Sequence, residues 1–247
     1  MSRYLQVLER AGREAELRSL ATHTESRVHA GQSFRSHEGL TREEVTKLVQ
    51  RLFLLPEEKD APRVVLFCNI EGGQGSSWFC TRVGQSLARL GKGTVCLLDA
   101  NLRAPRLHQI MGVKNQRGLV DVLFGAGSIC DLCLPTSTKD LWLVPSGPIV
   151  SEGHTQLGGE IMQGSLAALR AQFGYVLIDA PAASEHEDAA VVGKQADGVV
   201  LIVRANATRR ETTRQVKEAL EAANVRLLGA VMENRSFPIP EAIYRRL

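Results

Sequence analysis

The sequence predicts an α/β fold: a three-layer, mostly parallel sheet with helices on both faces. From Arg63 onward, apolar runs of strand length alternate with longer helical patterns. These runs are apolar on both faces, as strands buried between two helical layers must be. A glycine-rich loop joins the first run to the first of these helices, a connection typical of phosphate-binding α/β folds.

Each expected element follows from the same pattern. The strands are predicted at Val64–Cys68, Thr94–Leu98, Leu141–Val144, Tyr175–Ile178, Gly198–Val203 and Leu227–Met232. The helices between them are expected at about Ser76–Leu90, Gly159–Gln172, Asp188–Lys194 and Arg209–Ala223. Ligands on such sheets bind at the carboxyl ends of the strands, so we expect the site there.

The region before the sheet is organised differently. Residues 1–21 are predicted to form an amphipathic helix with balanced charges, and the polar stretch 22–40 a flexible linker. The α/β domain is expected at 41–237, with a tail at 238–247. Its first helix begins with the capping-box pattern Thr41/Glu44 and ends before Pro56.

Composition excludes several classes of protein. The 247 residues are 44% hydrophobic and carry a net charge of only +3, so nucleic acid is not an expected partner. No apolar run approaches the ~18 residues of a membrane span, and no signal peptide is present, so we expect a cytoplasmic protein with reduced cysteines. Cys130-x-x-Cys133 is half of a zinc or redox pattern; without a second pair, a structural role is favoured.

The glycine-rich loop predicts a phosphate site that lacks one essential charge. In a working loop, a lysine after the last glycine neutralises the β and γ phosphates, and the next Ser or Thr holds Mg²⁺. Ser76 stands at the lysine position, and no lysine occurs between Lys59 and Lys92. The candidate nucleotide-binding residues of the loop are Gly72, Gly73, Gly75, Ser76 and Ser77.

Two strands end in an acid. Asp99 and Asp179 each follow an apolar run, which places both carboxylates at the strand tips beside the loop. Such acids hold Mg²⁺ or its waters in P-loop enzymes. The candidate metal ligands are therefore Ser77, Asp99 and Asp179.

Several motifs, in order, carry a family resemblance. The segments Asp99–His108, Gly118–Leu123, Ile178–Pro181, Ala196–Leu201 and Gly229–Asn234 resemble the bacterial tyrosine kinases (BY-kinases) of exopolysaccharide and capsule loci. The resemblance covers about residues 41–235. It implies the deviant-Walker P-loop fold shared with ParA/MinD-like ATPases, ATP or ADP with Mg²⁺ as cofactor, and Asn234 as the residue that reads adenine.

The departures from that family make the chain look like a degenerate member. Besides the serine at position 76, Glu71 stands where ParA/MinD-like loops carry their signature lysine, and Asn101 replaces a family acid implicated in activating the attacking tyrosine. Asp99, Asn101 and Arg103 form the degenerate catalytic set, in which Arg103 is the better candidate for a substitute cation. We expect productive ATP turnover to be lowered by a factor of ~10³ or more, the scale of losing one preorganised electrostatic group.

Two further family features are weakened. In place of a C-terminal tyrosine cluster, the chain has Tyr244 as its one candidate phospho-acceptor, and Tyr175 belongs to a predicted core strand. The ring-forming pattern E-x-x-R-x-x-R becomes Glu44-x-x-Lys47-x-x-Gln50. Assembly into a homo-oligomer through this helix is therefore in doubt.

The favoured hypothesis is a regulatory partner protein of exopolysaccharide biosynthesis and export, impaired in catalysis, whose nucleotide binding is weak or lost. By resemblance, its partner is the cytoplasmic end of a membrane polysaccharide co-polymerase, contacted through residues 2–21 without insertion into the inner membrane. One alternative is an active tyrosine autokinase with a substitute cation. The other is a ParA/MinD-like positioning ATPase.

Overall fold

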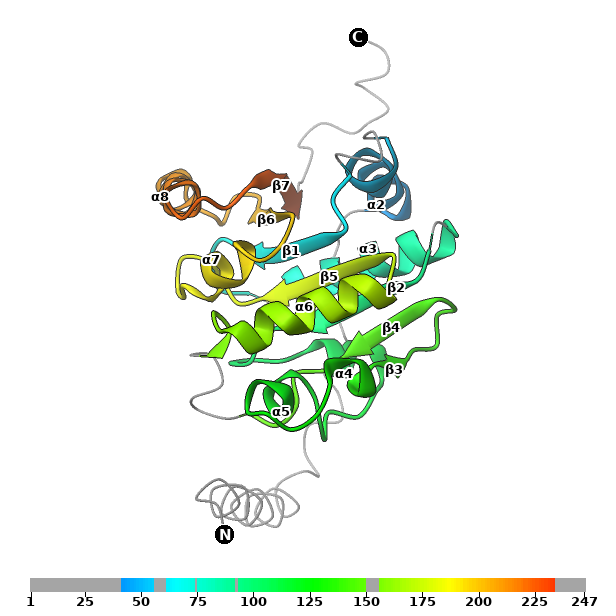
Figure 1. The fold of residues 1–247 in the computed structure, drawn as a ribbon. Coiled ribbons are helices and arrows are strands. Elements are labelled where there is room, and N and C mark those ends of the chain that lie inside the picture. The colour runs from blue at the N-terminus through cyan, green and yellow to red at the C-terminus, as the bar shows by residue number, and fades with distance from the viewer. Residues whose placement is uncertain (1–40, 56–60, 74, 92, 150–155, 234–247) are drawn as a thin grey trace, which may run out of the picture. The chain divides into compact units, whose positions relative to one another are not determined.

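The residues that the computed structural model describes, 41–55, 61–73, 75–91, 93–149 and 156–233, contain one seven-stranded sheet (Figure 1). Its strand order is β3-β4-β2-β5-β1-β6-β7. Neighbouring strands are parallel except for β3 and β4, which pair antiparallel. The strands are β1 (Val64–Asn69), β2 (Val95–Asp99), β3 (Leu134–Pro135), β4 (Leu141–Val144), β5 (Tyr175–Ala180), β6 (Gly198–Arg204) and β7 (Leu227–Glu233). The predicted fold class is confirmed.

Helices cover both faces of the sheet. They are α2 (Arg42–Val49), α3 (Gly75–Arg89), α4 (Leu107–Met111), α5 (Leu119–Leu123), α6 (Glu160–Gln172), α7 (Asp188–Gly193) and α8 (Arg210–Ala222). A π-helical turn, Gln50–Leu54, continues α2, and Ile129–Leu132 is a 3₁₀ helix. Figure 1 shows α6 and α7 in front of the sheet and α3 behind it.

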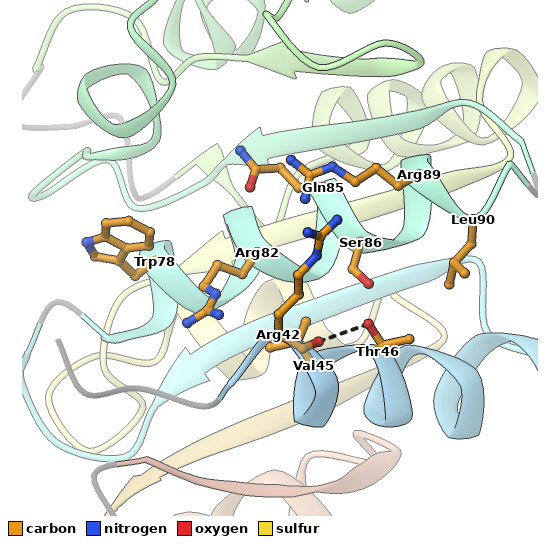
Figure 2. A pocket seen from close by; sticks show the side chains of 9 residues that line it. All are labelled: Arg42, Val45, Thr46, Trp78, Arg82, Gln85, Ser86, Arg89 and Leu90. Atoms are coloured by element: carbon orange, nitrogen blue, oxygen red, sulfur yellow. Dashed lines mark hydrogen bonds between the residues drawn. The ribbon is translucent and has the colours of Figure 1, made fainter. Parts of the chain in front are cut away.

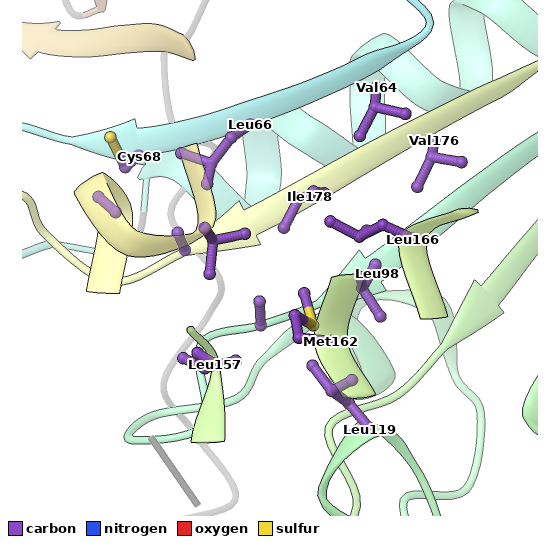
Figure 3. Close-up of a cluster of buried hydrophobic side chains, with 14 of the residues drawn as sticks. Val64, Leu66, Cys68, Leu98, Leu119, Leu157, Met162, Leu166, Val176 and Ile178 are labelled. Atoms are coloured by element: carbon purple, nitrogen blue, oxygen red, sulfur yellow. The ribbon is translucent and has the colours of Figure 1, made fainter. Parts of the chain in front are cut away.

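The two faces of the sheet carry separate apolar cores. Alternate residues of a strand point to opposite faces, so Val64 and Leu66 pack on one side while Val65 and Phe67 pack on the other. Figure 3 shows the first core, in which Ile178 of β5 and Leu166 and Met162 of α6 belong to the same cluster of buried side chains. The second core lies under α2, α3 and α4. Apolar side chains on both faces explain why these strands read as continuous apolar runs.

Most predicted strands continue further at their carboxyl ends, to Asn69, Asp99, Ala180, Arg204 and Glu233. All but one of these terminal residues are polar, and the polarity made them look like loop in the sequence. The consequence matters for function, because the backbone of the ladder holds these residues in place at the edge where ligands bind.

Four short elements, α4, α5, β3 and the 3₁₀ helix Ile129–Leu132, were not predicted. All are too short to show a periodic apolar pattern, and α4 and α5 begin at acceptors that lie outside the helix. The first N–H groups of α5, on Leu119 and Val120, donate to the carbonyls of Pro145 and Ser146 after β4, at 2.8 Å each. A β-carbon on Gly118 would collide with the backbone at Pro145, which gives the glycine of this motif a packing reason.

The capping box predicted for the first helix is confirmed: the Glu44 N–H donates to the Thr41 hydroxyl, and the Thr41 N–H donates to the Glu44 carboxylate at 2.6 Å.

The described residues all fall in one compact unit. The helix predicted at 1–21, the linker 22–40 and the tail 238–247 lie outside the described residues. Among the described helices, none has the length and apolar character to cross a membrane.

Candidate functional site

The glycine-rich loop lies at the carboxyl end of β1 and opens α3. Ser76 and Ser77 sit in the first turn of this helix, and each is only 2% exposed. The Asn69 side-chain amide donates to the Gly73 carbonyl at 3.1 Å and to the Ser76 hydroxyl at 3.4 Å. The last residue of β1 therefore contacts both the loop, at Gly73, and the start of α3, at Ser76.

Ser77 and Asp179 form one polar pair beneath the loop. The Ser77 hydroxyl donates to Oδ2 of Asp179, while the buried Oδ1 has no hydrogen-bond partner among the described residues. Burial raises the pKa of Asp179 to about 7, although the hydroxyls of Ser77 and Ser76 lower it in part. An unpartnered carboxylate oxygen beside a hydroxyl suits Mg²⁺, which prefers oxygen ligands. The pair fits its predicted metal role, which stays a prediction.

Asp99 lies directly opposite Asp179 on the neighbouring strand but has a different environment. Its Oδ2 accepts the N–H groups of Leu107 at 3.0 Å and Arg106 at 3.2 Å, at the start of α4. Its Oδ1 accepts the Asn101 N–H at 3.3 Å. Burial and the nearby Asp179 raise the pKa of Asp99 well above its usual range, against the pull of these N–H groups. The oxygens of Asp99 are thus used to anchor the chain.

The other two predicted catalytic residues are also held by the protein itself. Asn101 accepts the Ala104 N–H through Oδ1 at 3.2 Å, which closes a turn after β2. Arg103 forms an ion pair with Asp188 of α7, with Nε and Oδ2 3.0 Å apart. In the described part of the chain, no hydrogen bond or ion pair joins Arg103 to the loop. The structure therefore gives Arg103 a position that braces α7.

Three residues that the sequence analysis missed surround the loop. The carboxylate of Glu185 accepts the Gly72 N–H at 2.8 Å. A β-carbon on Gly73 would collide with the guanidinium of Arg204, and one on Gly75 with the carboxylate of Glu233. Arg204 and Glu233 end β6 and β7, so the strand-end rule that identified the aspartates would also have found them. Glu185 does not end a strand, so this rule would not have found it.

A separate groove of about 460 Å³ runs between α2 and α3. Figure 2 shows Arg42 on α2 facing Arg82 and Arg89 on α3, with Trp78 and Leu90 toward the two ends. No ion pair found within the described ranges involves these arginines. None of the predicted nucleotide or metal ligands lines this groove. It is a cationic surface on the helix that carries the loop.

The charged residues of the weakened ring pattern, Glu44 and Lys47, make contacts within or next to α2. The carboxylate of Glu44 is engaged in the capping box, and Lys47 pairs with Glu43 at 2.6 Å. The Glu43–Lys47 pair lies on the exposed surface, where it contributes little to stability. Both charged residues of the pattern thus have partners within their own helix.

Of the remaining predicted residues, Cys130, Cys133 and Tyr175 are described by the structure, whereas Asn234 and Tyr244 are not. Cys130 and Cys133 are free thiols beside the first apolar core, and the Cys133 thiol donates to the Ile129 carbonyl at 3.7 Å. Tyr175 stacks edge-on against Phe53 at 5.5 Å, which confirms its place in a core strand. Asn234 and Tyr244 lie outside the described residues.

Known proteins with similar sequences share the phosphate-loop α/β fold described above. The family model described as "Cellulose biosynthesis protein BcsQ" matches residues 63–230. The tyrosine-protein kinase YwqD of Bacillus subtilis is 31% identical over 163 residues, covering 66% of this chain and 68% of YwqD.

Two solved structures support the same fold. The kinase domain of the Escherichia coli tyrosine kinase ETK superposes with a TM-score of 0.73 at 21% identity, covering 80% of this chain and 78% of that one. MinD from Pyrococcus horikoshii, solved with Mg-ADP, gives a TM-score of 0.61 at 22% identity, covering 74% and 76% of the two chains. The chain therefore belongs to the bacterial tyrosine kinase family of exopolysaccharide and capsule systems, with the deviant-Walker P-loop fold of ParA/MinD-like ATPases.

Proposed function

We propose that this chain is a regulatory partner protein of exopolysaccharide biosynthesis and export, which binds ATP or ADP with Mg²⁺ weakly and transfers phosphate poorly. The observation that carries the proposal is the composition of the loop. Ser76 stands where the phosphate-binding lysine belongs, and the Glu185 carboxylate already accepts the Gly72 N–H. An arriving phosphate must displace an anion and finds no lysine to balance its charge.

The environment of the loop supports weak binding rather than none. The glycines, the first turn of α3 and the Ser77–Asp179 pair retain the features that receive a phosphate and Mg²⁺. The bond between Glu185 and Gly72 is exposed, so breaking it costs only about 1 kcal/mol. Nucleotide binding is then limited by charge, since the loop keeps its backbone architecture.

Phosphate transfer is expected to suffer more than binding. The lysine of a working loop stabilises charge that develops in the transition state, and its loss costs a factor of ~10³ in rate. Asn101 cannot act as a base, and its side-chain oxygen is engaged with the Ala104 N–H. Asp99 is committed to α4 through the Arg106 and Leu107 N–H groups. No group described at the end of β2 is therefore placed to activate a tyrosine.

Two measurements on purified protein test this proposal. We expect no phosphotyrosine after incubation with Mg-ATP, and weak but measurable Mg-ADP binding by calorimetry. The Ser76→Lys variant should bind Mg-ADP at least ~10-fold more tightly, because it restores the missing charge. Phosphotyrosine on the unaltered protein would contradict impaired transfer, and unchanged affinity in Ser76→Lys would contradict binding that is limited by the missing lysine.

The proposed partner is the cytoplasmic end of a membrane polysaccharide co-polymerase, which places the protein in the cytoplasm at the inner membrane. Support comes from the family: the tyrosine-protein kinase wzc of Salmonella typhimurium is 27% identical to this chain over 141 residues, which make up only 20% of that longer protein. Co-purification with the co-polymerase, identified by mass spectrometry, tests the pairing. Full retention of the partner after deletion of residues 1–21 would exclude the predicted helix as the dock.

One observation favours a second candidate, an active autokinase with a substitute cation. The guanidinium of Arg204 lies against Gly73 of the loop, whereas Arg103, the cation favoured by the sequence, is paired with Asp188. The phosphotyrosine measurement separates the two candidates. Self-assembly through α2 is expected to be weak in either case, because Glu44 and Lys47 are engaged within the helix.

A further inference from the structure

The end of β6 places an arginine beside the phosphate loop. β6 pairs in parallel with β1, with Asn69 opposite Ile202, so Arg204 emerges next to the segment that leaves β1. Its guanidinium occupies the space in which a β-carbon of Gly73 would stand. The Asn69 amide approaches the same position, 3.9 Å away. Two hydrogen-bond donors thus meet at Gly73.

The backbone of Arg204 is held firmly while its side chain is exposed. Its N–H donates to the Thr208 hydroxyl at 3.0 Å, and its carbonyl accepts the Thr208 N–H at 2.9 Å. On the other side, Arg204 is in register with Glu233 of β7. No ion pair found within the described ranges uses its guanidinium. The side chain can therefore reorient toward an anion from a fixed base.

The hollow beside the loop is small and mixed in charge. Its lining includes the charged residues Glu71, Arg204 and Glu233, and its volume of about 20 Å³ holds roughly one water molecule. Among the described residues of this lining, Arg204 is the one cation. An incoming phosphate must move these long side chains aside, and of the three only Arg204 attracts it.

We infer that Arg204 is the phosphate-binding cation of this loop and takes over the charge that Ser76 cannot supply. This inference rests on the proposed binding of Mg-nucleotide. A guanidinium presents a planar fork of N–H donors that matches two phosphate oxygens. It reaches the loop from the β6 side, whereas the family lysine enters from the first turn of α3. Arg204 therefore holds the nucleotide without restoring the lysine's position.

The test compares Mg-ADP affinity across four variants by calorimetry. We expect Arg204→Ala to weaken binding by ~10- to 100-fold, the range of one or two charge-assisted hydrogen bonds. Arg214→Ala is the matched control, since Arg214 is an exposed arginine paired with Glu218 on α8. Its affinity should equal that of the unaltered protein. In the Ser76→Lys background, Arg204→Ala should cost less than ~3-fold, because the lysine then carries the charge.

The outcomes separate this inference from the proposed function. If the unaltered protein binds Mg-ADP and Arg204→Ala binds it equally well, Arg204 is not the phosphate cation, while nucleotide binding stands. Equal losses from Arg204→Ala with and without the lysine would likewise overturn the substitution of one charge for the other. If the unaltered protein binds no Mg-ADP even at millimolar concentration, both proposals fall. Circular dichroism of each variant confirms that the fold is retained.

Discussion

Asp99 and Asp179 face each other across β2 and β5, both fully buried, yet they are used differently. Asp99 accepts three backbone N–H groups and holds the chain that leads into α4. Asp179 accepts no backbone N–H; it interacts with the hydroxyls of Ser77 and Ser76 and keeps a buried oxygen without a hydrogen-bond partner in the described structure. The same strand-end position thus gives one carboxylate that anchors the chain and one with an oxygen that no described residue engages; the metal role of the second stays a prediction.

The difference comes from the path of the chain after each strand. After β2 the chain turns back over the sheet edge, so its N–H groups converge on Asp99. After β5 the chain leads toward Glu185, whose side chain contacts the loop, and no described backbone N–H reaches the Asp179 carboxylate. A strand-end acid is therefore not a metal ligand by position alone. Whether such an acid can bind a metal depends on which of its oxygen lone pairs the protein leaves without a hydrogen bond.

The largest expected effect is on Asp99. Asp99→Ala should lower the free energy of unfolding by about 5 kcal/mol, because three N–H groups, those of Asn101, Arg106 and Leu107, lose their acceptor in a buried site. Urea denaturation followed by circular dichroism measures this. Asp179→Ala is the comparison and should cost much less. Equal losses in the two variants would remove the distinction between the aspartates.

The pH dependence of stability should reveal the contribution of Asp179 when the unaltered protein is compared with Asp179→Asn. Its pKa is raised from 3.8 to about 7 on folding, so the folded protein holds the proton more tightly than the unfolded chain. The stability contributed by this group is complete below about pH 4 and is lost as the pH rises to about 7, a change of about 4 kcal/mol. The loss should be smaller in Asp179→Asn, in which Asp99 alone of this pair keeps a pKa raised by burial. Parallel pH profiles for the two proteins would show that the carboxyl does not titrate in this way.

A third aspartate, at the opposite end of the strands, should show the reverse behaviour. Burial raises the pKa of Asp197, but bonds from the Val64 and Arg63 N–H groups and from Arg170 outweigh it, so the net pKa is lowered. Its contribution is therefore present at neutral pH and is lost in acid. Asp197→Asn should lower the free energy of unfolding by about 2 kcal/mol at pH 7. A loss that is as large at pH 3 would argue against the ionised form.

The smallest effect concerns the brace between α7 and the β2 loop. Asp188→Asn should cost about 1 kcal/mol, because it weakens one partly exposed ion pair with Arg103. Mg-ADP affinity should stay unchanged when Arg103 is released. An increase in affinity would show that Arg103, once free, serves the nucleotide.

Particular residues show how far the sequence alone reached. The apolar runs predicted most of the sheet because strand patterns are local. The missing lysine of the loop could also be recognised from the sequence, since Ser76 occupies its position. The short helices α4 and α5 escaped because their stability comes from distant acceptors, Asp99 and the carbonyl of Pro145. Arg204 and Glu233 directly follow predicted strands, and Glu233 lies within the family segment Gly229–Asn234, but neither side chain was recognised as part of the site.

The sequence by itself determined the fold class, the phosphate loop without its lysine and the two strand-end acids. Only the tertiary structure decided which acid keeps an oxygen available and which cation reaches the loop. The physical reason is that a periodic pattern depends only on residues close in the sequence. Arg204, by contrast, approaches Gly73 only because β1 and β6 pair in the folded sheet. Lone pairs and charges become available or engaged through such distant contacts, and function depends on them.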